Sequence, residues 1–450
     1  MSHDGNERSG LVVREAACSE YMHDAALSDL MIEPEIWVIR PHIQSVIDGS
    51  FGNDLLDGSR IRDALGRAVP LLRSSGFELA LSEDRTLFAW NTENQRRSFG
   101  RLLDHPAVVR FESQRGYRGS LVRALEGRRQ FDLTRRNRRL LRQLVEQLDI
   151  WDRSVRARFE RLLGLAILEI YVARRLFQTH RPRKLVAATQ HNVRVRAALV
   201  AAHAAGVPTV YVPHAPAANN RIYRDLPFDL AALRGPLEVD YYTDLGADPG
   251  RLHVVGDLSL SVRADSLPCP DGPIVVAPSP WEAPRVEKFI AMVDAGIKEP
   301  FVVCPHPRAD VAHMRELLPE RAHLVEGERT LDVIARGCGA VVQNSSGVAV
   351  EAMLLGTPVI EVPANGQPPT YLAISEPYVR IATTPAELHQ AVSTRAPEAR
   401  LHDVERARTW VRGWTAYTGT EAEARLRALL AWDIQPSGAL LDEWAPSDRD

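Results

Sequence analysis

A histidine and an arginine stand where one short apolar run of the chain ends. His306 and Arg308 follow "EPFVV" within "CPHPRAD" (304–310). The two flanking prolines fix φ and restrict the residues before them, so they stiffen this segment. Arginine can bind a phosphate through two parallel N–H groups. The residues allow two interpretations, a turn with an isolated imidazole or a strand end that directs both side chains at a phosphate.

A second segment has the residues of an anion site. "AVVQNSSGVAVEAMLLGTPVIEV" (340–362) predicts a strand, a polar turn, a helix and another strand. Small polar residues favour the start of a helix, where free N–H groups and the helix dipole attract phosphate. Glu351 would lie about 7 Å along the helix from Ser346, within reach of ribose hydroxyls, although a plain helix cap with a solvated glutamate fits too. The turn residues are Asn344, Ser345, Ser346 and Gly347.

Other polar residues also follow apolar runs. Ser279 ends a run in "APSPWEAPR" (277–285), His214 ends "TVYVPHA" and His42 ends "EIWVIRPH" (35–42). An imidazole at a strand end can take a proton from a substrate, although a structural histidine would look the same. We interpret His214 as the first candidate base and His42 as the second. Asp257, in "VVGDLS", is interpreted as a turn or hinge residue.

Strand-like and helical patterns alternate along most of the chain. Strands are expected at 35–42, 77–81, 86–90, 107–113, 184–190, 208–215 and 252–261, and helices over 115–180 (two or three) and 193–206. Beyond the breaker-rich segment 263–273, strands are expected at 274–279, 301–306, 322–327, 340–345, 358–363 and 378–383. This alternation predicts an α/β fold with two doubly wound parallel sheets. Ligands of such sheets bind at the carboxyl ends of the strands.

The composition is that of an ordinary globular protein. The 450 residues suggest two domains, and a net charge of −3 argues against a nucleic-acid-coating protein. The one D-x-D tripeptide, Asp448-Arg449-Asp450, falls in the expected tail, and a His/Cys ligand spacing is absent, so a metal site and a bound cofactor are not expected. The polar start and the lack of a spanning apolar run predict a cytoplasmic protein. The arginine-rich stretch 134–143 could contact an anionic acceptor or a membrane, but its spacing favours a solvated helix face.

"HP" followed by "SSG…E…LG-PV" resembles the donor-nucleotide half of GT-B glycosyltransferases. The closest types are bacterial surface-polysaccharide and CDP-glycerol transferases and the sialyltransferases with HP and SS motifs. The non-hydrolysing sugar-nucleotide 2-epimerases share the fold and a similar NSSG segment. The resemblance covers roughly residues 180–430. It implies that His306, Ser345 and Ser346 bind the donor's phosphates or nucleotide, and that His214 is catalytic.

The resemblance implies a glycosyltransferase and is compatible with bacterial surface-glycan or secondary-metabolite biosynthesis, and the missing metal-ligand spacing predicts a metal-independent enzyme. Its partners would be a nucleotide-sugar donor and an acceptor of unidentified type. The sequence is also compatible with a homodimer. The expected organisation is a leader (1–30), an acceptor-binding domain (31–262), a linker (263–273), a donor-binding domain (274–404), closing helices (405–435) and a tail (436–450). Proline before His214 and alanine after it depart from the family's Gln-His-Gly, which weakens the transfer of that role. A 2-epimerase and a non-catalytic nucleotide-sugar-binding protein remain alternatives.

Overall fold

The computed structural model describes residues 33–47, 85–90, 92–104, 108–110, 128–148, 152–179, 181–218, 226–260, 269, 271–279, 283–363, 369, 371–393 and 397–431. The expected leader, tail, strand 77–81 and most of the linker lie outside these ranges. Over the described ranges, the search for a helix with the length and hydropathy of a membrane span finds none.

The first sheet has six strands in the order β2-β1-β3-β4-β5-β6, and all neighbours are parallel. They are β1 (Thr86–Ala89), β2 (Val108–Arg110), β3 (Lys184–Ala187), β4 (Thr209–Tyr211), β5 (Leu230–Leu233) and β6 (Leu252–Val254). Around them lie α3 (Pro34–Ile47), α5 (Glu93–Arg97), η2 (Gly100–Asp104), α7 (Arg128–Gln147), α8 (Arg153–Thr179), α9 (Val193–Ala204), α10 (Pro236–Asp244) and η4 (Pro249–Arg251). The strand order reverses between β1 and β3, and such a reversal opens a ligand-binding crevice in open α/β sheets.

The second sheet also has six parallel strands, in the order β12-β11-β10-β7-β8-β9. They are β7 (Ile274–Ala277), β8 (Phe301–Val303), β9 (Ala322–Leu324), β10 (Ala340–Gln343), β11 (Val359–Glu361) and β12 (Arg380–Ile381). The helices are α11 (Ala283–Gly296), α12 (Val311–Leu317), α13 (Thr330–Ala335), α14 (Val348–Leu354) and α15 (Pro385–Ser393). Here the strand order reverses between β7 and β10. All these strands lie within predicted segments.

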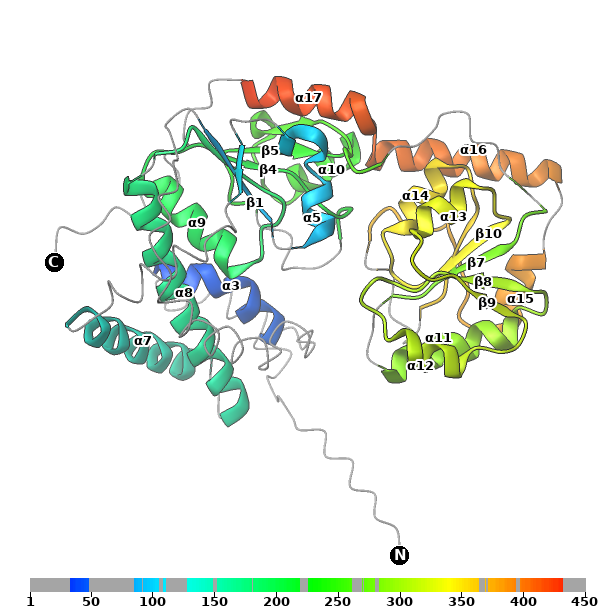
Figure 1. Ribbon diagram of the computed structural model, residues 1–450, viewed down its shortest axis with the longest axis horizontal. Coiled ribbons are helices and arrows are strands. Elements are labelled where there is room, and N and C mark those ends of the chain that lie inside the picture. The colour runs from blue at the N-terminus through cyan, green and yellow to red at the C-terminus, as the bar shows by residue number, and fades with distance from the viewer. Residues whose placement is uncertain are drawn as a thin grey trace, which may run out of the picture.

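The last two helices divide between the domains (Figure 1). Val411 and Trp414 of α16 (Pro397–Trp414) belong to a core cluster of the second domain. Leu426 and Leu429 of α17 (Gly419–Ala431) pack instead with Phe88 and other residues of the first domain. The predicted fold class is confirmed: the chain is α/β, with two doubly wound Rossmann-like domains as in the GT-B fold.

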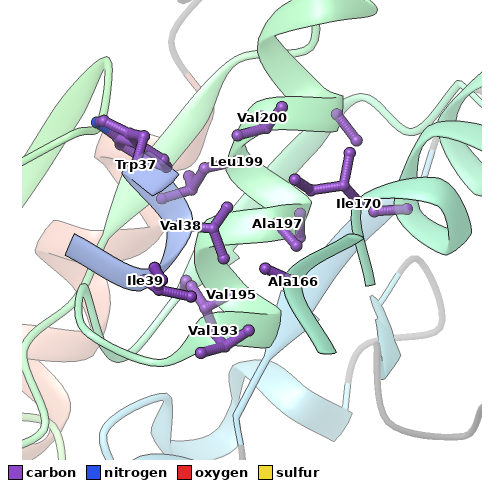
Figure 2. Packing of buried hydrophobic residues seen from close by; sticks show 14 of the residues in the cluster. Trp37, Val38, Ile39, Ala166, Ile170, Val193, Val195, Ala197, Leu199 and Val200 are labelled. Carbon is purple, nitrogen blue, oxygen red and sulfur yellow. The ribbon is translucent and has the colours of Figure 1, made fainter. Parts of the chain in front are cut away.

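The prediction of a strand over 35–42 is wrong, because this segment lies in α3. Its apolar side chains are buried against α8 and α9, as Figure 2 shows. A short continuous apolar run fits a buried helix as well as a buried strand. His42 is therefore inside a helix and not at a strand end.

A proline inside α3 creates the partner for a buried arginine. Pro41 has no N–H, so the Trp37 carbonyl one turn earlier loses its helical donor. Arg196 Nε of α9 donates to that carbonyl at 3.1 Å, and its Nη1 donates to the Gln190 carbonyl at 3.1 Å. The guanidinium also lies 3.7 Å from the centre of the Trp37 ring. Arg196 thus joins α3 to the segment that follows β3.

The helices α7 and α8 confirm the prediction of two or three helices over 115–180. Leu140 and Leu144 of α7 are buried, whereas Arg138 and Arg142 are exposed. Arg136 pairs with Glu33 and Glu35 at 2.8 and 2.7 Å. The arginine-rich stretch is therefore a solvated helix face that is partly paired with acidic residues.

Candidate functional site

Ser279 and Asn344 meet at the carboxyl ends of β7 and β10, where the second sheet reverses. The Ser279 N–H donates to Asn344 Oδ1 at 2.7 Å, and the Ser279 hydroxyl donates to the Asn344 carbonyl at 2.6 Å. Both residues are buried. Asn344 Nδ2 is also buried, yet it has no hydrogen-bond partner among the described residues. An unpaired buried donor is costly, so an oxygen of a bound ligand would satisfy it.

Ser345 has an unusual backbone, which a buried glutamate holds in place. Its φ is +49°, a left-handed conformation that costs a non-glycine residue about 1–2 kcal/mol. Both carboxylate oxygens of Glu361, which is fully buried on β11, accept from the Ser345 N–H at 2.9 and 3.1 Å. Gln343 Nε2 donates to the same carboxylate, and Gln343 Oε1 accepts from the Ser346 N–H at 2.6 Å. Burial raises the pKa of Glu361 to about 7.

These bonds correct one part of the sequence interpretation. The backbone N–H groups of Ser345 and Ser346 are not free for a phosphate, because Glu361 and Gln343 already accept from them. The Gly347 N–H makes no hydrogen bond within the described part of the chain. The Ser346 hydroxyl oxygen accepts from the Val348 N–H at 3.4 Å, and its own proton remains available. Donors to a ligand at this turn would therefore be the Asn344 amide, the Ser346 hydroxyl and the Gly347 N–H.

His306 and Arg308 lie after β8, the strand next to β7. The Arg308 N–H donates to His306 Nδ1 at 3.1 Å. A neutral imidazole that accepts at Nδ1 carries its hydrogen at Nε2, so His306 presents an N–H donor. Burial, followed by the charge of Arg308, lowers the His306 pKa to about 4. Arg308 is exposed and forms no ion pair with any residue that the structure describes.

Replacing His306 by alanine should weaken nucleotide binding by about 1–3 kcal/mol, the range for losing a hydrogen bond to a charged group. The reason is the loss of the Nε2 donor. Calorimetric titration with nucleoside diphosphates measures this change. His389→Ala, which removes an exposed histidine of α15, is the matched control and should bind like the parent. An unchanged affinity of the His306 variant would make "CPHPRAD" a turn without a binding role.

His214 lies after β4 with the opposite arrangement of ring nitrogens. Its Nδ1 is 2.5 Å from the Ala188 carbonyl, which follows the neighbouring strand β3. A carbonyl oxygen can only accept, so Nδ1 carries the hydrogen and Nε2 keeps its lone pair. Burial lowers the His214 pKa to about 4, and the charge of Arg234 acts in the same direction. The imidazole is therefore uncharged at neutral pH, and its Nε2 can accept a proton.

The segment that follows His214 contacts the second domain. A Cβ atom on Gly347 would lie 3.6 Å from Cδ of Pro216, so this segment lies against the turn that contains Ser345 and Ser346. The Leu372 N–H donates to the Ala217 carbonyl at 3.0 Å. From the first domain, Glu238 accepts from the Ala217 N–H at 3.0 Å. His214 and the polar turn are thus parts of one region.

A charged cluster lies in the same region. Arg234 and Asp257 form a buried ion pair at 2.8 Å. Asp257 also accepts from the Ser259 N–H and hydroxyl at 2.8 and 2.6 Å, which agrees with its interpretation as a turn residue. Glu351, on α14 of the second domain, has a pKa raised to about 7 by burial and then by the charge of Asp257. Arg234 acts on it in the opposite direction, so Glu351 lies near residues of the first domain.

Three histidines lie near one another at the carboxyl ends of β3 and β4. His191, which follows β3, has its Nδ1 2.9 Å from the Thr189 hydroxyl. Burial lowers its pKa to about 3, and the charges of His214, His42 and Arg196 contribute. His42 is buried and its Nδ1 has no partner among the described residues. The two histidines predicted as candidate bases are thus both close to His191, although His42 comes from a helix.

Replacing His42 by leucine should reduce the loss of stability in acid. Burial and Arg196 hold the folded pKa of His42 at about 4, below the ordinary histidine value of 6.5. The unfolded chain therefore binds an extra proton between these values, and this histidine lowers stability as the pH falls through that range. From about pH 7 to about pH 4.5, His42→Leu should lose roughly 2–3 kcal/mol less than the parent. Urea unfolding at each pH measures the difference.

The matched control is His389→Leu on an exposed face of α15. Its stability should follow that of the parent across the same range. Parallel pH profiles for His42→Leu and the parent would show that His42 is not held neutral in the folded protein.

Several residues of the region escaped the sequence interpretation. Gln343 and Glu361 each end an apolar strand with a polar side chain, "AVVQ" and "VIE", and this repeated pattern could have indicated them. His191 stands after the predicted strand 184–190 and could have been found in the same way. Arg196, Arg234 and Glu238 left no comparable local signal. Among the described residues, groups of three or more His, Cys, Asp or Glu side chains placed to hold a metal ion are not found.

Comparisons with known proteins give structural likeness only. No protein-family model matches the chain, and no curated protein matches its sequence. The UDP-GlcNAc 2-epimerase from Neisseria meningitidis, solved with UDP-GlcNAc, aligns with a TM-score of 0.45 at 12% identity, over 77% of this chain and 98% of that one. The glycotransferase of kitacinnamycin aligns with a TM-score of 0.47 at 12% identity, over 78% of this chain and 99% of that one. CalG4, the calicheamicin glycosyltransferase, aligns with a TM-score of 0.45 at 15% identity, over 77% of this chain and 98% of that one.

Proposed function

We propose that the protein is a glycosyltransferase that moves a sugar from a nucleotide-activated donor to an acceptor. The donor's diphosphate binds in the second domain, to Asn344, Ser346, Gly347, His306 and Arg308. Ser345 and Ser279 lie beside it, and Ser279 holds Asn344 in place through its N–H and hydroxyl. Glu351 binds the ribose. The positive charge of Arg308 and the N–H groups around it offset the charge that develops on the leaving diphosphate, without a bound metal ion.

His214 is the general base of this proposal. An acceptor hydroxyl attacks the anomeric carbon of the donor sugar, the bond from that carbon to the diphosphate breaks, and the hydroxyl proton passes to His214 Nε2. The supporting observation is that Pro216 lies close to Gly347, where a Cβ atom would be 3.6 Å from the proline Cδ. The segment after a proton-accepting histidine therefore lies against the polar turn. Proton transfer and leaving-group stabilisation would therefore take place side by side.

The test is incubation of the protein with a panel of nucleotide sugars, with and without a mixture of hydroxyl-bearing acceptors. We expect release of a nucleoside diphosphate together with a glycosylated product, only when acceptor is present. Conversion of a donor to its epimer without any acceptor would identify a sugar-nucleotide 2-epimerase instead. Binding of a nucleotide sugar without turnover under any condition would identify a non-catalytic binding protein.

A further inference from the structure

Ser345 is the one non-glycine residue of the described chain with a positive φ, and it stands in the middle of the proposed donor site. Before it, Asn344 carries a buried amide Nδ2 that has no hydrogen-bond partner in the described part of the chain. After it, Ser346 carries an available hydroxyl proton. The backbone of Ser345 therefore sets the direction of these two ligand-binding groups relative to each other. Strained backbone that the surrounding structure holds in place is concentrated at binding sites.

Glu361 holds this backbone, although its own burial is unfavourable. Its carboxylate is fully buried and accepts from the Ser345 N–H with both oxygens, at 2.9 and 3.1 Å, and from the Ser345 hydroxyl at 3.4 Å. Burial raises its pKa to about 7, and no arginine, lysine or histidine of the described chain offsets this. A buried carboxylate without a cation lowers stability. The fold alone therefore does not account for a glutamate at this position.

The direction of each hydrogen bond around Glu361 follows from the chemistry of its partners. The N–H groups of Ser345 and Ser346 can only donate, and an ionised carboxylate can only accept. The Gln343 amide must therefore turn its oxygen toward Ser346, at 2.6 Å, and its nitrogen toward Glu361. A group that only accepts, at position 361, thus determines how two successive N–H groups of the turn are held.

We propose that Glu361 is a positioning residue of the donor site, which acts through Ser345 and Gln343 and does not touch the donor. By fixing the turn, it presents the Asn344 amide and the Ser346 hydroxyl to the diphosphate. The inference rests on the proposed function, because it requires a nucleotide to bind at this turn. Replacing Glu361 should lower nucleotide affinity without removing any group that binds the nucleotide.

The test compares variants by calorimetric titration with the diphosphates of uridine, thymidine, cytidine, guanosine and adenosine. In Glu361→Gln the new amide places an N–H opposite another donor of the network, so affinity should fall at least roughly tenfold. In Gln343→Glu two buried carboxylates face each other, and affinity should fall by at least as much. The swapped variant, which carries both substitutions, again gives every N–H group an acceptor. It should bind within about threefold of the parent.

Glu387→Gln is the matched control. Glu387 also accepts from two successive backbone N–H groups, those of Thr383 and Thr384 at 2.7 and 3.2 Å, but it is exposed and lies at the start of α15. This variant should bind like the parent. Urea unfolding of every variant separates a loss of affinity from a loss of the fold.

Parental affinity in a folded Glu361→Gln would overturn the inference, and so would a folded swapped variant that binds as weakly as the single variants. Hydrogen exchange of the parent, followed by NMR, needs no variant. Without nucleotide, the N–H groups of Ser345 and Ser346 should exchange slowly and that of Gly347 faster, since only the first two have acceptors in the described chain. Equally fast exchange at all three would also overturn the inference.

A parent that binds none of the five diphosphates would count against the donor site itself and remove this role with it. A parent that binds one of them, together with an unchanged Glu361→Gln, would count against Glu361 alone. The two failures can therefore be told apart.

Discussion

Replacing His214 by alanine should lower kcat by roughly 10²–10⁴-fold, the range for losing a general base. The physical reason is that the Ala188 carbonyl fixes the hydrogen on Nδ1 and leaves Nε2 as the proton acceptor. Donor binding should stay close to that of the parent, because His214 belongs to the first domain. Steady-state kinetics with a hydroxyl acceptor, together with calorimetry of the nucleotide, separate the two effects.

The control for this variant is His389→Ala, which removes an exposed histidine of α15 and should leave both kcat and nucleotide binding unchanged. A His214→Ala variant that works at the parental rate with a hydroxyl acceptor would remove this residue from the mechanism. A small loss is expected only with an intrinsically acidic nucleophile, such as a thiol, which needs little help from a base.

Replacing Asp257 by alanine should destabilise the protein by about 3–5 kcal/mol, because Arg234 would remain buried with an uncompensated charge. The pair is 2.8 Å apart, and the two side chains are 5% and 3% exposed. The Ser259 N–H and hydroxyl would lose their acceptor as well. Removing the negative charge should also lower the pKa of Glu351, since Asp257 raises it. Urea unfolding measures the stability change.

Asp403→Ala is the matched control, because Asp403 pairs with Arg406 at 3.0 Å but both side chains are about half exposed. An exposed pair contributes roughly 0–1 kcal/mol. A double variant that replaces Arg234 and Asp257 by methionine and leucine should recover part of the loss, since no buried charge remains. If Asp257→Ala and Asp403→Ala lower the free energy of unfolding equally, the buried Arg234–Asp257 pair does not stabilise the protein more than an exposed pair does.

The second domain could be predicted from the sequence in detail. Its strands are rich in valine and isoleucine, and Gly, Pro and Ser separate them clearly from the helices. The first domain was harder to predict. The strand β5 has the sequence "LAAL", which contains no β-branched residue, so the sequence pattern predicts no strand there. The run in α3 was assigned to the wrong element because its apolar residues are buried on all sides.

The sequence predicts the positions of those candidate site residues that directly follow a strand. His214, Ser279, His306 and Asn344 all come within a few residues of a strand, as the parallel sheets require. The use of the N–H groups at Ser345 and Ser346 was not predictable, since it depends on side chains from two adjacent strands. The position of Arg196 beside His42 depends on Pro41 and on the packing of α3 against α9. Such contacts connect residues that are far apart in the chain.

The most direct measurement is hydrogen exchange of the whole protein with and without nucleoside diphosphates that carry each of the common bases. We expect at least one of them to slow exchange in the segments around His306 and around Asn344 to Glu351. The same nucleotide should protect these segments much less in His306→Ala. Exchange that no nucleotide slows in these segments, or protection confined to other parts of the chain, would contradict a donor site at the carboxyl ends of β7, β8 and β10.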